Sequence, residues 1–225
     1  MAGILFIISA PSGSGKSTLV TQLRTLVEGL DFSISYTTRA PRGSEENGRE
    51  YYFTTRQEFE RMVAADDFLE WAEVFGNYYG TAVAALHHAK DLGKDLLLDI
   101  DVQGALQVMK KTPQAVSIFI LPPSPQILEK RLKNRSAAEK VTDESIIQKR
   151  LAGARNEIKQ VWDYKYALVN DVLENAVAEM RAIVLFERGD SECESLANGC
   201  RTDAASLKLK TVLSAFGEDL PDFHR

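Results

Sequence analysis

The stretch that most constrains the fold is a short apolar run followed at once by a glycine-rich turn, GILFIISAPSGSGKST from Gly3 to Thr18. The run Ile4 to Ser9 is continuously apolar, as is typical of a buried strand in a parallel sheet. The turn Ala10 to Ser17 then opens a helix, which we expect from about Ser17 to Val27. This order predicts an α/β fold with a phosphate site at the helix N-terminus.

The residues of this turn match a phosphate-binding loop in type and spacing. Gly13 and Gly15 allow backbone N–H groups to face a phosphate, and Lys16 reaches the outer phosphates. The Ser17 hydroxyl can ligate Mg²⁺, while Ala10 replaces the usual first glycine. The expected nucleotide-binding residues of the loop are Ser12, Gly13, Ser14, Gly15, Lys16, Ser17 and Thr18.

Further along the chain, apolar strands continue to alternate with helical segments. We expect strands at Leu96 to Asp101 and Val116 to Leu121, followed by helices through Met109 and from Pro125 to Asn134. The prediction is a parallel sheet covered by helices on both faces. An acid that ends such a strand can hold Mg²⁺ or its water ligands, so Asp99 is a second candidate metal ligand.

Two segments interrupt this alternation. Residues 33–81 are rich in β-formers and aromatic residues and predict an inserted small lobe, in which Trp71, Phe75 and Tyr78 are expected to pack. Residues 135–143 are polar and predict a lid, placed at about 135–150. Apolar residues at helical spacing then predict a long amphipathic helix, and a strand is expected from Tyr166 to Val169.

Composition and charge limit the classes of partner. The 225 residues are 44% hydrophobic and 26% charged with a net charge of −5, so we expect a globular protein that does not bind nucleic acid. The apolar run near the N-terminus lacks the basic flank of a signal peptide and is too short to span a membrane. Cys193 and Cys200 match no zinc pattern and are expected to be free thiols of a cytoplasmic protein.

One polar loop, SISYTTRAPRGSEENGREYYF from Ser33 to Phe53, is too poor in apolar residues to be core. Arg39 and Arg42 can clamp a second phosphate, because guanidinium groups bind phosphate oxygens in a bidentate manner. Arg49 is instead expected to pair with a neighbouring glutamate, Glu46 or Glu50.

Three segments that follow the phosphate loop in order, TTRAPRGSEENGREYYF, EWAEVFGNYYGT and LLLDIDVQG, resemble the guanylate kinase family. The resemblance runs from about Ile4 to Glu187. It implies a kinase domain at 1–188, with residues 33–81 as the nucleoside-monophosphate lobe. It also implies transfer of a phosphoryl group from ATP, with Mg²⁺, to GMP.

The resemblance also assigns roles to individual residues. Guanine presents N–H donors beside an acceptor oxygen, so carboxylates and hydroxyls are complementary to it. The residues implied for the GMP phosphate are Arg39, Arg42, Tyr51 and Tyr79, with Glu45 as a further nucleotide-site acid. Those implied for guanine are Ser35, Glu70, Thr81 and Asp101. Those implied for the transferring phosphoryl group are Lys16, Arg39, Arg131, Arg135 and Arg150, and Asn170 is implied near adenine.

Two alternatives remain at this point. One is a kinase for another nucleoside monophosphate, which the acids Glu70 and Asp101 disfavour for adenylate. The other is a guanylate-kinase-like scaffold that binds protein partners without catalysis, which Lys16 and Ser17 disfavour. Residues 189–225 carry none of the motifs, so this C-terminal extension is expected to be peripheral and dispensable for activity; the oligomeric state is left open.

Overall fold

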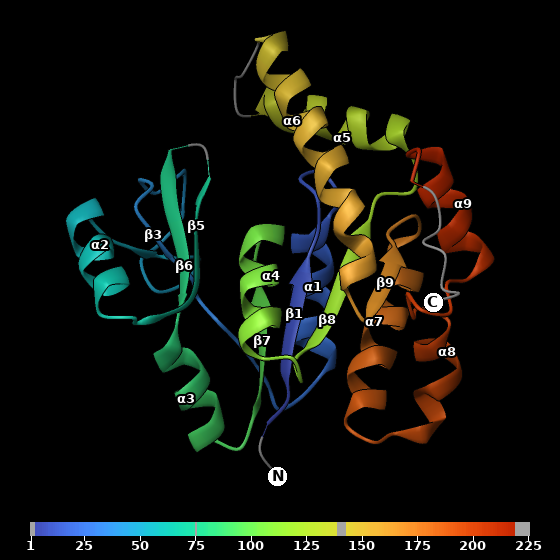
Figure 1. Cartoon of the computed structure of the whole chain (residues 1–225), viewed down its shortest axis with the longest axis horizontal. Coiled ribbons are helices and arrows are strands. Elements are labelled where there is room, and N and C mark those ends of the chain that lie inside the picture. Colours follow the sequence, from blue (N-terminus) through green and yellow to red (C-terminus); the bar gives the residue numbers. More distant parts are fainter. Residues whose placement is uncertain (1–2, 75, 139–142, 219–225) are drawn as a thin grey trace. The chain divides into compact units, whose positions relative to one another are not determined.

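The apolar runs form a parallel sheet, drawn in the computed structural model of Figure 1, which describes residues 3–74, 76–138 and 143–218. The strand order is β2-β7-β1-β8-β9. Phe6, Ile7 and Ile8 are fully buried in the central strand, which explains why this run is apolar on both faces. The strands are β1 Leu5–Ser9, β2 Leu30–Phe32, β7 Asp95–Asp99, β8 Val116–Leu121 and β9 Tyr166–Val169.

The chain divides into two compact units, residues 1–7 with 29–115 and residues 8–28 with 116–225. In the first unit, β2 pairs in parallel with β7, and in the second β8 pairs in parallel with β9. The helices of the first unit are α2 Arg56–Ala64, α3 Val83–Asp91 and α4 Val102–Lys111. Those of the second are α1 Lys16–Leu26, α5 Pro125–Ala138, α6 Glu144–Ile158 and α7 Leu173–Glu187, with a 3-10 turn η1 at Lys159–Asp163.

Strand β7 ends two residues earlier than the expected strand Leu96 to Asp101. The reason is local, because the Asp101 carboxylate accepts a hydrogen bond from the Gly104 backbone N–H at 2.8 Å and caps helix α4. A residue with this role takes an extended backbone conformation and leaves the sheet. Asp101 is thereby held at the carboxyl end of β7.

Helix α5 is longer than the expected helix from Pro125 to Asn134, and Arg135 lies within it. The sequence Ser-Ala-Ala at 136–138 has adequate helix propensity, so its polar surroundings do not end the helix. Helix α6 begins at Glu144 after Asp143, whose carboxylate accepts from the Ser145 N–H at 2.8 Å. The predicted lid therefore consists largely of helix ends, and its residues 139–142 lie outside the described residues.

The predicted small lobe contains a four-stranded sheet with strand order β4-β3-β6-β5. Its short strands are followed by a hairpin in which Trp71 pairs with Gly80. The rings of Phe59, Trp71 and Tyr78 pack together, as expected for the last two, whereas Phe75 lies outside the described residues. The strands are β3 Tyr36–Thr37, β4 Tyr52–Phe53, β5 Phe68–Val74 and β6 Asn77–Ala82.

The C-terminal extension differs from the expectation that it is peripheral. It forms a 3-10 turn η2 at Ser191–Cys193 and two helices, α8 at Glu194–Asn198 and α9 at Leu207–Ala215. Figure 1 draws these elements in orange and red beside α7 and β9. Both cysteines are free, as expected, and burial raises the pKa of Cys200 to about 12. Among the described residues, every helix is too short or too polar to cross a membrane.

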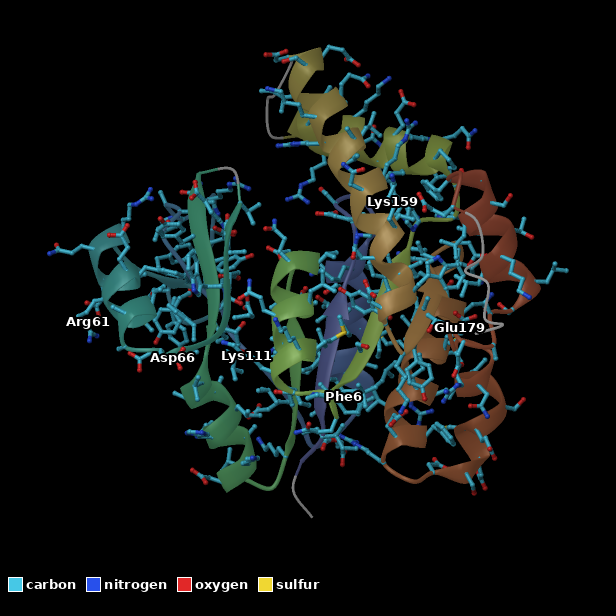
Figure 2. The ribbon with its side chains drawn as sticks, in the orientation of Figure 1. Phe6, Arg61, Asp66, Lys111, Lys159 and Glu179 are labelled. Atoms are coloured by element: carbon cyan, nitrogen blue, oxygen red, sulfur yellow. The ribbon has the colours of Figure 1, made fainter. Side chains whose placement is uncertain are left out.

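A prediction concerns the core of the small sheet. Phe59 is fully buried, and its ring stacks on Phe68 with centroids 4.5 Å apart. Phe59→Ala leaves a cavity and should lower the free energy of unfolding by about 3–5 kcal/mol, measured by urea denaturation. Arg61→Ala on the same helix is the control, because its 2.7 Å pair with Glu58 is exposed and screened by water, so its loss should change stability little (Figure 2). Equal losses in the two variants would contradict the prediction.

Candidate active site

The phosphate loop connects β1 to α1 and is shaped by two glycines. Gly13 and Gly15 have φ of 89° and 86°, in the left-handed region that favours glycine. The Ser14 N–H donates to the Pro11 carbonyl at 3.1 Å, which closes the turn. Lys16 is the first residue of the helix, so the loop ends at the positive end of the helix dipole. The predicted strand, loop and helix are therefore confirmed in their order and position.

The carbonyl oxygen of Ser14 is the point at which the rest of the second unit holds this loop. It accepts hydrogen bonds from Asn170 Nδ2 at 2.7 Å and from an Arg131 guanidinium N–H at 3.1 Å. The C=O and the following N–H of a trans peptide point in opposite directions. The N–H of Gly15 must therefore point away from Asn170 and Arg131, which leaves it available for an anion.

Gly15 is also required for the close approach of Asn170. A Cβ atom at position 15 would lie 2.4 Å from Asn170 Nδ2, which is far inside van der Waals contact. Asn170 is only 6% exposed, and its backbone N–H donates to Leu121 at 2.8 Å. The sequence predicted a role for Asn170 near adenine, and the structure gives its side-chain amide a partner in the loop. The strand-end position after β9 was the only signal for this contact.

The three arginines of the second unit that were implied for the transferring phosphoryl group lie on α5 and α6 and differ in their contacts. Arg131 bridges the loop carbonyl and the Asn170 carbonyl, the latter at 3.2 Å, and burial lowers its pKa. Arg135, one helical turn later, donates to the Ser12 hydroxyl at 3.5 Å. Arg150 donates to the Ser136 hydroxyl at 3.0 Å. Arg131 and Arg135 are thus brought to the loop, while Arg150 contacts the helix that carries them.

In the first unit, Arg39 is held by a carboxylate before any ligand binds. Its guanidinium donates to both oxygens of Glu45, at 2.9 and 3.0 Å, and Glu45 also accepts from the Arg42 backbone N–H at 2.8 Å. The hydrogen bonds from Arg39 lower the pKa of Glu45. Glu45 therefore orients Arg39, while the Arg42 side chain is more exposed.

Two tyrosines complete this cluster. The Tyr51 ring lies 5.9 Å from the Tyr79 ring, and the Arg39 guanidinium lies 5.3 Å from the Tyr51 centroid. Burial raises the pKa of Tyr51, so its hydroxyl stays a hydrogen-bond donor at neutral pH. The predicted phosphate residues Arg39, Tyr51 and Tyr79 are thus in one place. Arg49 instead pairs with Glu46 and Glu50 on the surface, as expected.

Two of the residues predicted to contact guanine, Glu70 and Thr81, pair in the small sheet, and Asp101 lies near Glu70 at the start of α4. Glu70 pairs with Thr81 in the β5–β6 ladder, and the antiparallel register of β3 with β6 places Ser35 opposite Thr81. Glu70 is 4% exposed, and its burial, together with the nearby Asp101, raises its pKa to about 7. The Thr81 hydroxyl is buried without a hydrogen bond of normal geometry, although it lies close enough to Glu70 to favour the ionised carboxylate.

One face of helix α4 positions Glu70, a feature that the sequence reasoning missed. A Cβ atom on Gly104 would lie 2.4 Å from Glu70 Oε2, so a larger residue at this position would displace the carboxylate. Gln107 donates to the Trp71 carbonyl at 2.8 Å and accepts from the Trp71 N–H at 3.3 Å. Lys111, labelled in Figure 2, donates to the Leu69 carbonyl at 2.9 Å. Both neighbours of Glu70 are thus fixed, and the 101, 104, 107, 111 spacing of α4 was the available signal.

The predicted metal ligands provide oxygen donors. Ser17 is exposed in the first turn of α1, and Asp99 ends strand β7. A hydroxyl and a carboxylate are donors of the kind that Mg²⁺ prefers, with phosphates and water completing its coordination. In the residues that the structure describes, no group of three or more His, Cys, Asp or Glu side chains forms a metal site.

A phosphate loop on a parallel α/β sheet, with separate arginine–tyrosine and carboxylate clusters, defines a nucleotide kinase of the phosphate-loop class. The sequence model of the guanylate kinase family matches residues 3–187. The chain therefore belongs to the guanylate kinase family.

Individual relatives agree with this assignment. The chain is 61% identical to a guanylate kinase of Koribacter versatilis, over 84% of this chain and 80% of that protein. It is 48% identical to a guanylate kinase of Dechloromonas aromatica, over 82% of this chain and 89% of that protein. A crystal structure of guanylate kinase from Anaplasma phagocytophilum superposes with a TM-score of 0.68 at 35% identity, covering 85% of this chain and 89% of that one.

The contact between Asn170 and the loop gives a prediction. Asn170→Ala removes one of two donors to the buried Ser14 carbonyl and leaves Arg131, a loss of about 0.5–1.5 kcal/mol, so ATP affinity should fall about 2–12-fold. Asn170→Asp should be worse, because a carboxylate would face a carbonyl oxygen. Titration calorimetry with ATP measures both, and Asn134→Ala, an exposed asparagine of α5, is the control. Unchanged ATP affinity in Asn170→Ala would show that the loop does not depend on this contact.

The buried Glu70 gives a second prediction, on the pH dependence of stability. Its pKa of about 7 in the folded chain exceeds the ordinary 4.5, so the folded state holds a proton that the unfolded state has lost. Stability of the parent should therefore fall as pH rises from about 4.5 to 7. The difference of about 2.5 in pKa corresponds to about 3 kcal/mol.

Glu70→Gln removes this titration, so its stability relative to the parent should rise across that pH window. Urea denaturation at a series of pH values measures the difference. Glu73→Gln, on an exposed side chain of the same strand, should not reproduce the slope, because an exposed charge keeps its hydration. Parallel curves for the parent and Glu70→Gln would contradict the assignment of a buried, partly protonated Glu70.

Proposed function

We propose that this chain transfers the terminal phosphoryl group of MgATP to GMP, giving ADP and GDP. The observation that carries the proposal is the buried pair Glu70 and Thr81 with Asp101 nearby, in the unit that also holds the oriented Arg39. Carboxylate and hydroxyl oxygens accept from the N1–H and N2–H₂ groups of guanine, whereas adenine offers an unprotonated N1 at the corresponding edge. A buried carboxylate is costly unless a ligand satisfies it, which favours guanine.

Residues of the first unit are proposed to bind GMP. Ser35, Glu70, Thr81 and Asp101 contact the base. Arg39, Arg42, Tyr51 and Tyr79 bind its phosphate, and Glu45 keeps Arg39 in the orientation that the phosphate needs. Because both terminal nitrogens of Arg39 already donate to Glu45, little side-chain entropy is lost when GMP binds.

Residues of the second unit are proposed to bind ATP. The backbone of Ser12 to Gly15 cradles its phosphates, Lys16 carries positive charge to the outer ones, and Ser17 and Thr18 follow in the first helical turn. Asn170 and Arg131 keep the loop in shape, and Asn170 is further proposed to lie near adenine. Arg131, Arg135 and Arg150 are proposed to offset the charge of the transferring group.

Mg²⁺ is the proposed cofactor, held through Ser17 and Asp99 with the donor phosphates. When bound, it neutralises charge on the phosphate oxygens. The acceptor phosphate has a second pKa near ~6 and is largely dianionic at neutral pH, so no side chain has to remove a proton from it. The chain's own contribution is to align two polyanions and to stabilise their charge.

The wider assignments belong to the same proposal. The partners are the small molecules ATP and GMP, with no nucleic acid and no membrane surface, which the net charge of −5 supports. Free thiols support a cytoplasmic location. Residues 1–188 are proposed to form the kinase domain, with 33–81 as the GMP lobe and about 135–150 as a lid over the phosphates.

Turnover tests the proposal directly. ADP release, coupled to a second enzyme, is measured with GMP, AMP, CMP and UMP as acceptors. We expect GMP to exceed AMP by roughly 10⁴ in kcat/KM, since the buried acceptors stay unpaired with adenine. Glu70→Gln should erode that ratio, because the amide replaces one acceptor by a donor. An unchanged ratio there and in Asp101→Asn would mean that these acids do not select the base.

Lys16→Ala, in the same assay, should lose roughly 100-fold or more in kcat while the chain stays folded. Lys159→Ala, an exposed lysine labelled in Figure 2, is the matched control and should keep its turnover. A folded parent that turns over no monophosphate would favour the scaffold alternative.

A further inference from the structure

The chain continues beyond residue 187, where its match to the family model ends. This C-terminal extension, residues 189–218 of the described chain, lies in the same unit as the phosphate loop. Its helices bury Ala197, Leu209, Val212 and Leu213, each less than 9% exposed. The helices of the extension therefore pack against the rest of the second unit.

Part of the extension adds to the sheet. Strand β9 is an edge strand, and the Ala167 N–H donates to the Cys200 carbonyl at 2.8 Å. Two residues on, the Thr202 N–H donates to the Lys165 carbonyl at 3.2 Å, which brackets an antiparallel bridge between Tyr166 and Arg201. The Thr202 hydroxyl also donates to the Tyr164 carbonyl. Residues 200–202 thus satisfy backbone groups that an edge strand leaves exposed.

Helix α9 also reaches the residue that follows Asn170. The Lys208 ammonium lies 3.1 Å from Asp171 Oδ1 and 3.8 Å from a carboxylate oxygen of Glu179 on α7. Asp171 Oδ1 also accepts from the Val172 N–H at 2.8 Å, which forms the turn into α7. Partial burial opposes ionisation here, but the Val172 N–H and Lys208 still hold the pKa of Asp171 below its ordinary value.

These contacts form a continuous path to the phosphate loop. Lys208 holds Asp171; Asp171 adjoins Asn170; and the Asn170 amide donates to the Ser14 carbonyl. We propose that the C-terminal extension is a brace for the donor half of the site and that Lys208 is its positioning residue for ATP binding. Lys208 acts through Asp171, and its ammonium is directed at two carboxylates. This inference rests on the proposed use of ATP, and it replaces the expectation that the extension is dispensable.

The first test uses single substitutions in the full chain. Lys208→Ala should raise the KM for ATP about 1.4–5-fold, the range expected for a partly exposed ion pair of about 0.2–1 kcal/mol, and leave the KM for GMP unchanged at saturating ATP. Lys208→Arg should restore most of the loss. Lys210→Ala, an exposed lysine on the same helix, is the matched control and should change neither constant.

The dependence of ATP affinity on salt concentration separates this role of Lys208 from a general effect on folding. The difference in ATP affinity between the parent and Lys208→Ala should shrink as ionic strength rises toward 1 M, because the ion pair is screened. Titration calorimetry with ATP gives this difference without turnover, so it is obtained even if GMP proves not to be the acceptor. A parent that binds ATP but prefers another monophosphate would overturn the proposed function and leave this inference standing.

The second test shortens the chain. A chain ending after Asp203 loses α9 and keeps the residues that pair with β9, and its KM for ATP should rise at least as much as in Lys208→Ala. Thermal unfolding is followed in parallel. A folded shortened chain with a lower Tm but the parent's ATP affinity, or a Lys208→Ala variant with that affinity, would overturn the proposal. If the shortened chain does not fold, the ATP affinities of the full-length Lys208→Ala and Lys208→Arg variants decide whether Lys208 positions the ATP site.

Discussion

The phosphate loop depends on one buried carbonyl oxygen, that of Ser14. Asn170 and Arg131 hold it from one side, and this fixes the direction of the next peptide N–H. An anion site made of backbone N–H groups is useful only if those groups are preorganised, since turning them on binding would cost free energy. The glycine at position 15 is needed both for the left-handed backbone and for the space that Asn170 occupies. Loop, strand end and helix α5 therefore constrain one another.

The acceptor half follows a different principle, in which charge is buried or oriented before the ligand arrives. Arg39 is bound at two points by Glu45, so its geometry is set while its charge is partly compensated. Ionisation of Glu70 costs more free energy than that of Glu45, because the Glu70 carboxylate is buried and lies near Asp101. Such a group lowers the stability of the empty protein at neutral pH and regains that free energy from a ligand that donates hydrogen bonds.

The sequence predicted most of the sheet because buried parallel strands are continuous apolar runs, and Val116 to Leu121 and Tyr166 to Val169 were placed without error. It placed the end of β7 wrongly, since capping by Asp101 depends on where the helix starts. It also identified Arg39 and Tyr51, which lie in one cluster, and Glu70 and Thr81, which pair in another. The sequence did not reveal Gly104, Gln107 and Lys111, because their partners lie on a strand more than thirty residues away. Gly104 faces the Glu70 carboxylate, and the other two donate to backbone carbonyls. The sequence did not predict the packing of residues 189–218 for the same reason, since the strand edge that they cover is remote in sequence.

Gly104 limits the evolutionary routes open to this site. The space that its missing side chain leaves is filled by the Glu70 carboxylate, so the identities of positions 70 and 104 are coupled. A lineage that replaced the glycine first would displace the acid, and one that shortened the acid first would leave a void against α4. A substitution at position 70 that keeps the length of the side chain can therefore change the base preference alone, whereas a larger residue at position 104 would disturb the acid at the same time.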